Sequence, residues 1–369
     1  MIAEKSIETN CSSTADAIKK SNMLKLAEYQ KTLFINPKLE ILFFELTDSC
    51  NLNCRHCGSR CSASNKMYLD REVIEGVINS VAERYAPQKI MINLTGGEPL
   101  LHKDCIGIIK YARMKGFPVG MTSNGTLIDM AMARELKKAG LDTISISLDG
   151  IGSSHDELRM VSGSFDRAVN GIRALKSVDI EPQITTVVHK DNIDELDKIY
   201  NFAIENDIYS WRLTNVDPIG RALDARNMLL NYGELIRLFD YIKEKRFDKN
   251  NSMEVTYGCS HFVSFDYERM IRKFYFQCGA GTKSASIMVN GDIGACLDIE
   301  RRKDLVQGNA YKDDFIDAWE NRFKIFRQDR TRLSKNCSEC SYSNVCMGDS
   351  AHTWDFNENE PMYCITVNK

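Results

Sequence analysis

The sequence predicts an α/β protein built on a parallel sheet, followed by a second module rich in cysteine. From about Lys38 onward, apolar strand-like runs alternate with amphipathic helical windows, which is the pattern of repeated βα units. The 369 residues, 43% hydrophobic and 27% charged, suffice for one large core or for two domains. Beyond residue 275 the composition changes and cysteines recur, which indicates where the second module begins.

Six strands and five intervening helices are predicted between residues 39 and 215. The strands are predicted from short apolar runs bounded by turn residues: Leu39–Leu46, Lys89–Leu94, Phe117–Thr122, Asp142–Leu148, Glu181–Val188 and Tyr209–Asn215. The helices are predicted from amphipathic windows: Asp70–Arg84, Lys103–Lys115, Asp129–Ala139, Ser164–Ser177 and Ile193–Asn206. Ligands of such folds bind at the carboxyl ends of the strands, so the motifs found there are the candidates for function.

Charge and composition argue against several classes of function. The net charge of −3 and the pI near 6.1 give no indication of a nucleic-acid surface. No apolar run approaches the roughly 20 residues that a membrane span requires, and the N-terminal residues are too polar for a secretory signal. We therefore expect a cytoplasmic protein with no nucleic-acid or membrane partner. In a reducing compartment, 13 cysteines are better explained as metal ligands than as disulfides.

Three cysteines in the run Cys50-x3-Cys54-x2-Cys57 follow the first predicted strand. Three thiolates on a short loop can bind three irons of a cubane iron–sulfur cluster and leave the fourth iron open to a small molecule. The spacing alone also allows a zinc site completed by Cys61 or His56, because structural zinc requires a closed tetrahedron.

A glycine-rich turn at residues 95–99 (Thr-Gly-Gly-Glu-Pro) follows the second predicted strand. Its Gly96, Gly97 and Glu98 present backbone polar groups beside a carboxylate at the end of a strand. Placed about forty residues after the cysteine run, the turn makes the chain resemble the radical S-adenosylmethionine (SAM) enzymes. The resemblance implies a partial (β/α)6 radical SAM barrel and a [4Fe-4S] cluster on the three cysteines. It also implies that the open iron chelates the amino and carboxylate groups of SAM, while the turn receives the amino group.

Polar side chains also lie near the ends of the third to sixth predicted strands. The resemblance implies that those on the third and fourth strands contact the ribose and carboxylate of SAM. Those on the fifth and sixth strands would reach the cofactor or the substrate. The candidate cofactor-binding residues in this group are Ser123, Asn124, Ser145, Ser147, Asp149, His189 and Arg212. An ordinary Asn-Gly turn at 124–125 and an exposed strand-end histidine at 189 are the alternatives.

A second set of cysteines comprises Cys278-x12-Gly291-x4-Cys296, Cys337-x2-Cys340-x5-Cys346 and Cys364. In this order and spacing, the set resembles the SPASM domain, which is appended to radical SAM enzymes that modify peptides. The Asn-Gly pair at 290–291 between apolar residues predicts a hairpin. The resemblance implies that the last four cysteines ligate an outer auxiliary iron–sulfur cluster. A zinc ribbon is the alternative explanation of the C-x2-C pair with two later cysteines.

The inner auxiliary cluster departs from the family pattern. It would use Cys278, Cys296, an upstream cysteine for which Cys259 is the candidate, and a fourth cysteine at a position that is Ser350 in this chain. We predict three cysteine ligands, with Ser350, Asp349 or a substrate group at the remaining iron. A two-iron cluster, or no inner cluster, is the alternative.

The chain is expected to divide into four segments. Residues 1–36 would be an N-terminal extension and residues 37–219 the radical SAM partial barrel. Residues 220–275 would form a mainly helical bridge, with its clearest helix at Tyr232–Phe247. Residues 276–369 would form the SPASM auxiliary iron–sulfur domain.

The resemblance implies an enzyme that reductively cleaves SAM to a 5′-deoxyadenosyl radical and abstracts hydrogen from an inert carbon. We predict a ribosomal peptide or protein substrate that receives an oxidative modification such as a cross-link. The alternatives are the same chemistry on a small molecule such as a tetrapyrrole, peptide epimerisation with Cys61 or Cys105 as hydrogen donor, and a non-enzymatic zinc scaffold. Expected partners are a low-potential electron donor such as flavodoxin or ferredoxin and a separate precursor-recognition protein. Asp298 is a candidate proton acceptor near the inner cluster.

Overall fold

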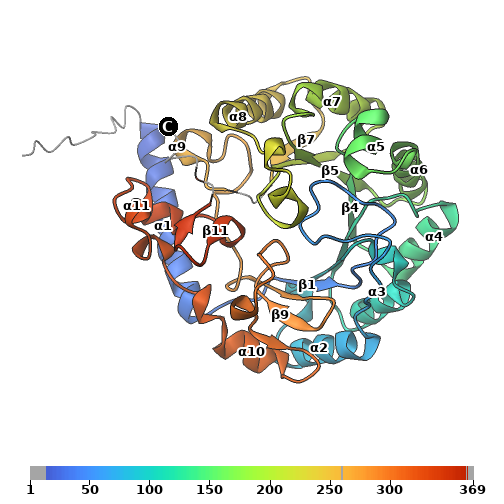
Figure 1. Ribbon diagram of the computed structural model, residues 1–369, viewed down its shortest axis with the longest axis horizontal. Helices are drawn as coiled ribbons and strands as arrows, with labels where there is room; N and C mark the ends of the chain where they lie inside the picture. The colour runs from blue at the N-terminus through green and yellow to red at the C-terminus, as the bar shows by residue number, and fades with distance from the viewer. Residues whose placement is uncertain (1–13, 259–260, 363, 365–369) are drawn as a thin grey trace, which may run out of the picture.

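The computed structural model describes residues 14–258, 261–362 and 364, so Cys11 and Cys259 lie outside the described residues. Figure 1 shows the helices arranged around the outside of a strongly curved sheet. The sheet has the strand order β10-β9-β8-β1-β2-β3-β4-β5-β6-β7. The predicted strands form its parallel centre as β1 (Ile41–Glu45), β2 (Met91–Thr95), β3 (Val119–Ser123), β4 (Thr143–Ser147), β5 (Pro182–Val188) and β6 (Ser210–Asn215). The predicted α/β fold with a partial barrel is confirmed.

The predicted helices connect these strands. They are α2 (Arg71–Arg84), α3 (Cys105–Met114), α4 (Met130–Ala139), α6 (Ser164–Lys176) and α7 (Leu196–Glu205), with a short additional helix α5 (Ser153–Arg159) before α6. The ends of α4 have clear chemical causes. The side chain of Asp129 caps its first turn by accepting from Met132 N, and Gly140 ends it with a φ of +88°.

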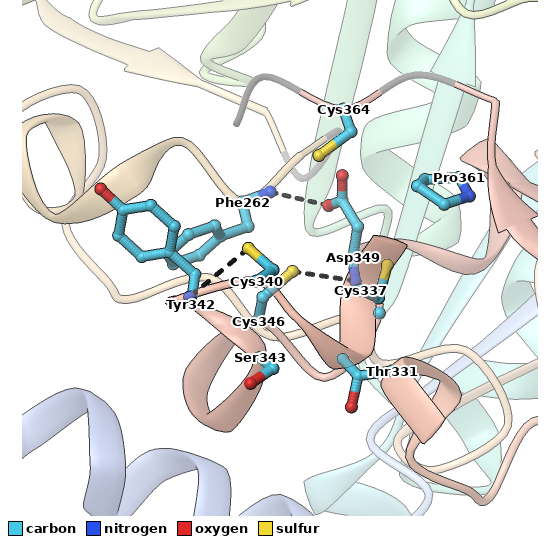
Figure 2. Close-up of a pocket in the computed structure, with 11 residues that line it drawn as sticks. Phe262, Thr331, Cys337, Cys340, Tyr342, Ser343, Cys346, Asp349, Pro361 and Cys364 are labelled. Carbon is cyan, nitrogen blue, oxygen red and sulfur yellow. Dashed lines mark hydrogen bonds between the residues drawn. The ribbon is translucent and has the colours of Figure 1, made fainter. Parts of the chain in front are cut away.

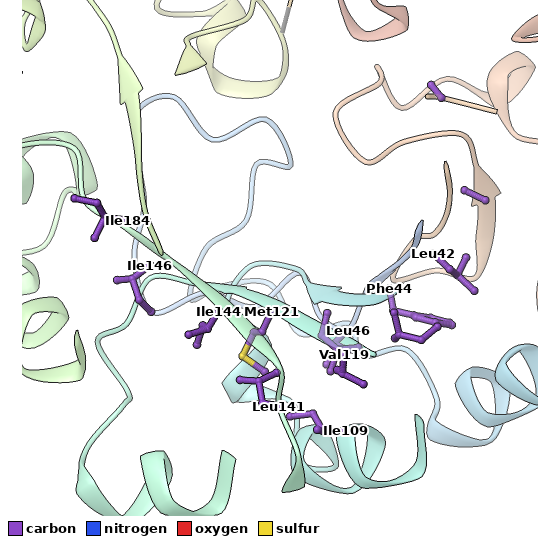
Figure 3. Close-up of a cluster of buried hydrophobic side chains, with 14 of the residues drawn as sticks. Leu42, Phe44, Leu46, Ile109, Val119, Met121, Leu141, Ile144, Ile146 and Ile184 are labelled. Atoms are coloured by element: carbon purple, nitrogen blue, oxygen red, sulfur yellow. The ribbon is translucent and has the colours of Figure 1, made fainter. Parts of the chain in front are cut away.

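The main core lies between the sheet and these helices. Figure 3 shows side chains in this layer, among them Leu42 and Phe44 of β1 and Ile144 and Ile146 of β4, with Ile109 of α3. Burial alternates along the strands, as in β5, because successive side chains point to opposite faces. The residues on the other face line the interior of the barrel.

Residues 220–275 contain more than the expected helix. The helix α8 (Tyr232–Phe247) is present and begins with a capping box between Asn231 and Glu234. After it, β7 (Glu254–Tyr257) adds a seventh parallel strand beside β6, and α9 (Ser264–Tyr267) follows. The strand has only four residues, which is too short for a clear periodic pattern.

The sheet continues from the barrel into the cysteine-rich module. Strand β8 (Ser284–Ile287) pairs in parallel with β1, and β9 (Asp292–Gly294) pairs antiparallel with β8. The predicted Asn-Gly turn joins β8 to β9, and Gly291 has a φ of +85°. The strand pairing therefore crosses the boundary expected at residue 276, although the domain limits stay a prediction.

The rest of the C-terminal module consists of short elements. They are β10 (Gly308–Asn309), α10 (Phe315–Asn321), α11 (Lys335–Ser338), α12 (Ser343–Cys346), β11 (Trp354–Asp355) and β12 (Glu360–Pro361). The N-terminal helix α1 (Thr14–Ile35) lies beside this module rather than beside the barrel helices (Figure 1). Met23 of α1 packs with Phe262 and Phe276, and Lys19 Nζ donates to the Phe265 carbonyl at 2.8 Å. No helix in the described ranges has the length and apolar character needed to cross a bilayer.

Candidate active site and auxiliary cysteine sites

The three cysteines predicted to hold a cubane lie in the loop that follows β1. Cys50 and Cys54 are buried and Cys57 is half-buried, and Leu52 and Cys61 belong to the same cluster. Burial raises the pKa of Cys50 to about 12, so this thiol stays protonated unless a metal ion compensates the thiolate charge. A hydrogen bond with the Cys61 thiol instead lowers the pKa of Cys57. The loop thus gathers the predicted ligands, with Cys61 beside one of them.

Arg221 ties this loop to the segment after β6. Its backbone N–H donates to the carbonyl of Cys57 at 3.0 Å. Its Nε donates to the carbonyl of Cys54 at 2.7 Å and its Nη2 to that of Cys61 at 2.9 Å. One side chain and its own backbone therefore hold three carbonyl groups of the loop. No local sequence pattern marks Arg221, and sequence analysis did not identify this role.

The Gly-Gly-Glu turn packs directly against the cysteine loop. The N–H of Gly97 donates to the Thr47 carbonyl at 2.7 Å, and that of Glu98 donates to the Ser49 carbonyl at 3.0 Å. Gly96 has a φ of +146°, and a Cβ there would lie 2.5 Å from the Thr47 oxygen. A Cβ on Gly97 would lie 2.2 Å from the Ser49 oxygen. The two backbones can approach this closely only because both residues are glycine.

The carboxylate of Glu98 is fully buried behind the turn. It accepts hydrogen bonds from Leu100 N at 3.2 Å, Asn124 N at 2.8 Å and Ser123 Oγ at 2.9 Å. Burial raises the pKa of Glu98 to about 7 in spite of these bonds. A carboxylate has about four acceptor positions, so about one is left for an ammonium group of a ligand. Asn124 Nδ2 also lies 3.9 Å from Cys50 Sγ, which brings Ser123, Asn124 and Glu98 beside the cysteine loop.

Asp149, just after β4, is buried in an ion pair with Arg159 of α5. Arg159 Nε donates to Asp149 Oδ2 at 2.7 Å, and Arg159 Nη1 lies 3.5 Å from Cys54 Sγ. Burial alone would raise the pKa of Asp149, but the guanidinium lowers it to about 2. Val187 N donates to Asp149 Oδ1 at 2.8 Å. The pair places a positive charge beside the cysteine loop, and sequence analysis did not identify Arg159.

The remaining predicted cofactor-binding residues lie in two places. His189 is buried just after β5, where burial lowers its pKa and its Nε2 has no hydrogen-bond partner among the described residues. Ser147 is half-buried at the end of β4. Ser145 and Arg212 line the interior of the barrel, where Arg212 Nη2 donates to Ser145 Oγ at 3.1 Å. The structure therefore places Ser145 and Arg212 in the wall of the barrel, and their contact with the cofactor stays a prediction.

A cavity of about 680 Å³ runs through the barrel. Inward-facing residues of β1 to β6 form its wall, and Cys296 and Asp298 of the second module contribute to its lining. Thr95, the residue before the Gly-Gly-Glu turn, also lines it, so the cavity reaches the strand end that carries the turn. Small-molecule sites in proteins enclose about 300–1,000 Å³, and this cavity falls in that range. Asp298 is exposed, with Oδ2 4.0 Å from Cys296 Sγ, whereas Cys105 is buried in the core at the start of α3.

The four cysteines of the predicted outer cluster line one small cavity. Figure 2 shows around it the side chains of Cys337, Cys340, Cys346 and Cys364. Backbone N–H groups point at two of these sulfurs, with Tyr342 N 3.5 Å from Cys340 Sγ and Asp349 N 3.1 Å from Cys346 Sγ. Hydrogen bonds to sulfur tune the potential of iron–sulfur clusters. The donor set fits a four-cysteine cluster, and the ligand assignment stays a prediction.

The inner set contains two described cysteines and no thiol at the expected fourth position. Cys278 and Cys296 are half-buried, and Ala351 N donates to Cys278 Sγ at 3.4 Å. Ser350 occupies the fourth position, is fully buried, and places its Oγ 3.0 Å from His352 Nε2. Its hydroxyl thus interacts with a histidine in this structure, and three-cysteine ligation stays a prediction.

A buried network of histidines and carboxylates joins the barrel to the second module. Asp217, two residues after β6, lies 3.2 Å from His261 Nε2 and 3.1 Å from His352 Nε2. Burial by itself lowers the pKa of each histidine, but the Asp217 carboxylate raises them, that of His261 to about 9 and that of His352 to about 8. Asp349 adds a second carboxylate 3.6 Å from His261 Nδ1. Sequence analysis missed this network because its members are far apart along the chain.

Comparisons with known proteins agree with this architecture. The model of the radical SAM superfamily matches residues 44–203, and that of the SPASM iron–sulfur cluster-binding domain matches residues 278–341. The AdoMet-dependent heme synthase of Methanosarcina barkeri is 29% identical over 88% of this chain and 96% of its own length. The mycofactocin maturase MftC of Mycolicibacterium smegmatis is 29% identical over 83% of this chain and 76% of its own length. The structure of Streptococcus suis SuiB bound to S-adenosylmethionine matches at a TM-score of 0.71 and 19% identity, covering 89% of this chain and 77% of SuiB.

The matched ranges contain the motifs described above. The cysteine loop and the Gly-Gly-Glu turn lie within residues 44–203, and Cys278, Cys296, Cys337 and Cys340 lie within residues 278–341. The first domain implies SAM and a [4Fe-4S] cluster, and the second implies auxiliary iron–sulfur clusters. Residues 44–203 of this chain therefore match the radical SAM superfamily, and residues 278–341, in its C-terminal part, match the SPASM domain.

Proposed function

We propose that this enzyme cleaves SAM reductively and uses the 5′-deoxyadenosyl radical to remove a hydrogen atom from a substrate carbon inside the barrel. The observation that carries the proposal is the packing of the Gly-Gly-Glu turn against the cysteine loop at one end of the 680 Å³ cavity. This arrangement brings three thiols, a buried carboxylate and a space of substrate size together. A static scaffold needs no such combination.

The residues of the site fit the groups that the domains imply. Cys50, Cys54 and Cys57 would hold a cluster with one open iron, and Glu98 would receive the amino group of SAM through its remaining acceptor position. Arg159 would offset negative charge on the Cys54 sulfur. When bound, the reduced cluster would supply the electron for reductive cleavage of the carbon–sulfur bond of SAM, which yields the 5′-deoxyadenosyl radical. The chain's own contribution is to bind and orient SAM and to keep water away from the reacting carbon.

The substrate we propose is a side chain of a peptide or protein, which would undergo a net oxidation. The similarity to the mycofactocin maturases supports this choice. The fold is also compatible with it, since the structure of SuiB bound to its precursor peptide SuiA matches 99% of this chain at a TM-score of 0.70 and 18% identity. The auxiliary cysteine sets would hold iron–sulfur clusters that could accept one electron from the substrate radical, which completes the net two-electron oxidation.

A second candidate substrate is a tetrapyrrole. The match to the heme synthase of Methanosarcina barkeri extends over 96% of that enzyme. The Fe-coproporphyrin III synthase of the same organism is 30% identical over 58% of this chain and 53% of its own length. Anaerobic incubation with the peptide encoded by a neighbouring gene should give a mass loss of two hydrogens. Loss of carbon dioxide and two hydrogens from a propionate arm of Fe-coproporphyrin III, with the peptide unchanged, would favour the tetrapyrrole instead.

The cleavage of SAM itself is tested by removing the three thiols. Replacing Cys50, Cys54 and Cys57 together by alanine should abolish formation of 5′-deoxyadenosine by the dithionite-reduced protein, while iron bound to the auxiliary sites remains. Cys105→Ala is the matched control, because this thiol is buried in α3 outside the loop, and it should retain cleavage. Undiminished 5′-deoxyadenosine from the triple variant would overturn the proposal.

A further inference from the structure

The wall of the barrel cavity carries one cationic side chain. Among the described residues that line it, Arg212 is the only lysine or arginine. The two carboxylates of the lining, Glu181 and Asp298, are both exposed, and Glu181 lies just before the start of β5. Arg212 instead is half-buried in the middle of β6. The positive charge therefore lies in the wall of the barrel, partway along β6.

Hydrogen bonds hold Arg212 in a defined position. Its Nη2 donates to Ser145 Oγ at 3.1 Å and to Thr185 Oγ1 at 3.4 Å. Ser145 Oγ in turn donates to Gln183 Oε1 at 3.2 Å, and Gln183 Nε2 donates to Ser210 Oγ at 2.8 Å. These residues come from three adjacent strands, β4, β5 and β6, which fixes the network to the wall of the barrel. Ser145 and Thr185 carry hydroxyl groups, and a hydrogen-bond network of this kind orients a guanidinium before a ligand arrives.

The backbone of Arg212 lies below the strand ends that carry the group that would hold SAM. Arg212 precedes the end of β6, Asn215, by three residues, so its Cα lies about 10 Å below that strand end. Glu98, Asp149 and the cysteine loop all follow their strands at the top of the barrel. A molecule that reacts at the top can therefore extend an arm down the cavity to Arg212. The planar fork of a guanidinium matches a carboxylate through two parallel hydrogen bonds.

We infer that Arg212, oriented by Ser145 and Thr185, anchors a carboxylate of the substrate inside the barrel. This inference rests on the proposed function, because it names the chemical class of the molecule on which the radical acts. The anchor holds the carboxylated arm in the cavity while the reacting carbon stays near the strand ends. Both candidate substrates contain such a group, as a propionate arm of a tetrapyrrole or as an acidic side chain of a peptide. The site thus selects a carboxylate group, whether a tetrapyrrole or a peptide carries it.

The test compares acids with uncharged analogues on the anaerobically reconstituted full-length enzyme. Calorimetric titration uses coproporphyrin III against its tetraamide, and acetyl-Ala-Glu-Ala-amide against acetyl-Ala-Gln-Ala-amide. We expect one acid to bind at least about 10-fold more tightly than its neutral analogue, since a hydrogen bond to a charged group contributes this much or more. The pair that shows the difference identifies the source of the carboxylate. Equal affinities within both pairs would overturn the inference.

Variants then test the residue itself. Arg212→Gln should weaken binding of the preferred acid about 10- to 100-fold and remove the preference over the neutral analogue. Arg212→Lys keeps the positive charge but lacks the planar guanidinium fork. Its affinity for the acid should therefore lie between those of the unmodified enzyme and of Arg212→Gln. Arg237→Gln is the matched control, because this arginine is exposed on α8 and pairs with Asp194. Thermal melting of each variant shows whether the fold is retained. If a variant does not fold, the comparison of acids with neutral analogues on the unmodified enzyme still tests whether the cavity prefers a carboxylate.

Two further outcomes separate this inference from its alternatives. If Arg212→Gln weakens SAM binding as much as acid binding, Arg212 contacts the cofactor and the inference is wrong. If the unmodified enzyme forms no 5′-deoxyadenosine under reducing conditions, the proposed function fails. In that case the binding comparison still reports whether Arg212 holds a carboxylate, so the two failures remain distinguishable.

Discussion

Single atoms decide how closely the cysteine loop and the Gly-Gly-Glu turn approach each other. Gly96 and Gly97 face the carbonyl oxygens of Thr47 and Ser49, which belong to the backbone and have little freedom to move. A Cβ at either position would lie within 2.5 Å of one of these oxygens. The pair of glycines is therefore required by contact between two loops, and Gly96 is required by its positive φ as well.

Gly97→Ala should destabilise the protein and displace the cysteine loop. The added methyl group meets the Ser49 oxygen at 2.2 Å, and relieving such a clash typically costs about 1–3 kcal/mol of unfolding free energy. Gly76→Ala is the control, because Gly76 is exposed on α2 with no atom within 4 Å of an added Cβ. That change should stabilise the protein by about 0.5–1 kcal/mol. Urea unfolding measures both, and a Gly97→Ala variant as stable as the parent would show that the loops can separate without cost.

The pKa of Glu98 predicts how SAM affinity depends on pH. Burial raises this pKa to about 7, so the carboxyl group is mostly neutral at pH 6 and mostly ionised at pH 7.5 or above. An ammonium group of SAM binds the ionised form better, so affinity should rise between pH 6 and pH 7.5. Glu98→Gln should weaken binding about 10- to 100-fold at pH 7.5 and remove the part of the pH dependence that comes from this carboxylate. If equilibrium binding shows the same dependence of SAM affinity on pH in the parent and in Glu98→Gln, the role of Glu98 is contradicted.

At the residue scale, sequence analysis found the groups that stand in a recognisable spacing. The cysteine run and the Gly-Gly-Glu turn are short local patterns, and the structure packs them against each other. Arg159 and Arg221 were missed because they reach the loop across 105 and 167 residues of sequence, where no local pattern points to the contact. Arg212 was expected to reach the cofactor or the substrate; its side chain lines the barrel cavity, and its role stays a prediction. Where an inward-facing side chain lies along a barrel depends on strand register, which one sequence does not reveal.

At the scale of elements, the pairing of β8 with β1 joins the two modules. Glu45 at the end of β1 is almost fully buried and accepts hydrogen bonds from Val289 N at 3.1 Å and Arg301 Nη1 at 3.0 Å. Arg301 Nη2 also donates to Ser59 Oγ at 2.8 Å, and Ser59 lies in the cysteine loop between Cys57 and Cys61. The segment after β8 is therefore attached both to the first barrel strand and to the cysteine loop.

Glu45→Gln should loosen this attachment. The variant keeps the shape of the side chain but loses the charge that holds Arg301, and we expect a loss of about 1–3 kcal/mol in unfolding free energy. Hydrogen exchange should increase in residues 284–301 more than in the remaining barrel strands. Glu40→Gln is the control, because the Glu40–Lys283 ion pair joins the same two segments at an exposed site and should contribute about 0–1 kcal/mol. Unchanged exchange in residues 284–301 of Glu45→Gln would show that strand pairing alone suffices.

The elements themselves were predicted to different degrees. The six barrel strands and five helices were found because each combines a clear apolar period with turn residues at its ends. The hairpin of β8 and β9 was predicted from its Asn-Gly turn. The parallel pairing of β8 with β1 could not be inferred, because β1 lies more than 240 residues earlier in the chain. Strand β7 and helix α5 were missed because four and seven residues are too few to show a period.

At the scale of the whole molecule, three distant segments meet in the network around Asp217. His261 comes from the segment after β7 and His352 from the C-terminal module, while Asp217 follows the last of the six predicted strands. All three side chains are largely or fully buried. A charged network under such burial is stable only while opposite charges are paired, so protonation of the histidines supports the contact between barrel and SPASM domain.

The contact between the domains should therefore weaken at alkaline pH. Burial alone lowers the pKa of His352, but Asp217 raises it to about 8, above the ordinary value of 6.5. The pair thus contributes its full stability below about pH 6.5, and this contribution is lost as the pH rises through about 8. A shift of this size corresponds to about 2 kcal/mol of unfolding free energy. Urea unfolding of chelator-treated protein should show His352→Gln to be less stable than the parent at pH 6, with the difference shrinking by pH 9. A difference that stays constant or grows with pH would mean that His352 is neutral in the folded protein and that hydrogen bonding alone, without charge, joins the C-terminal segment to the barrel.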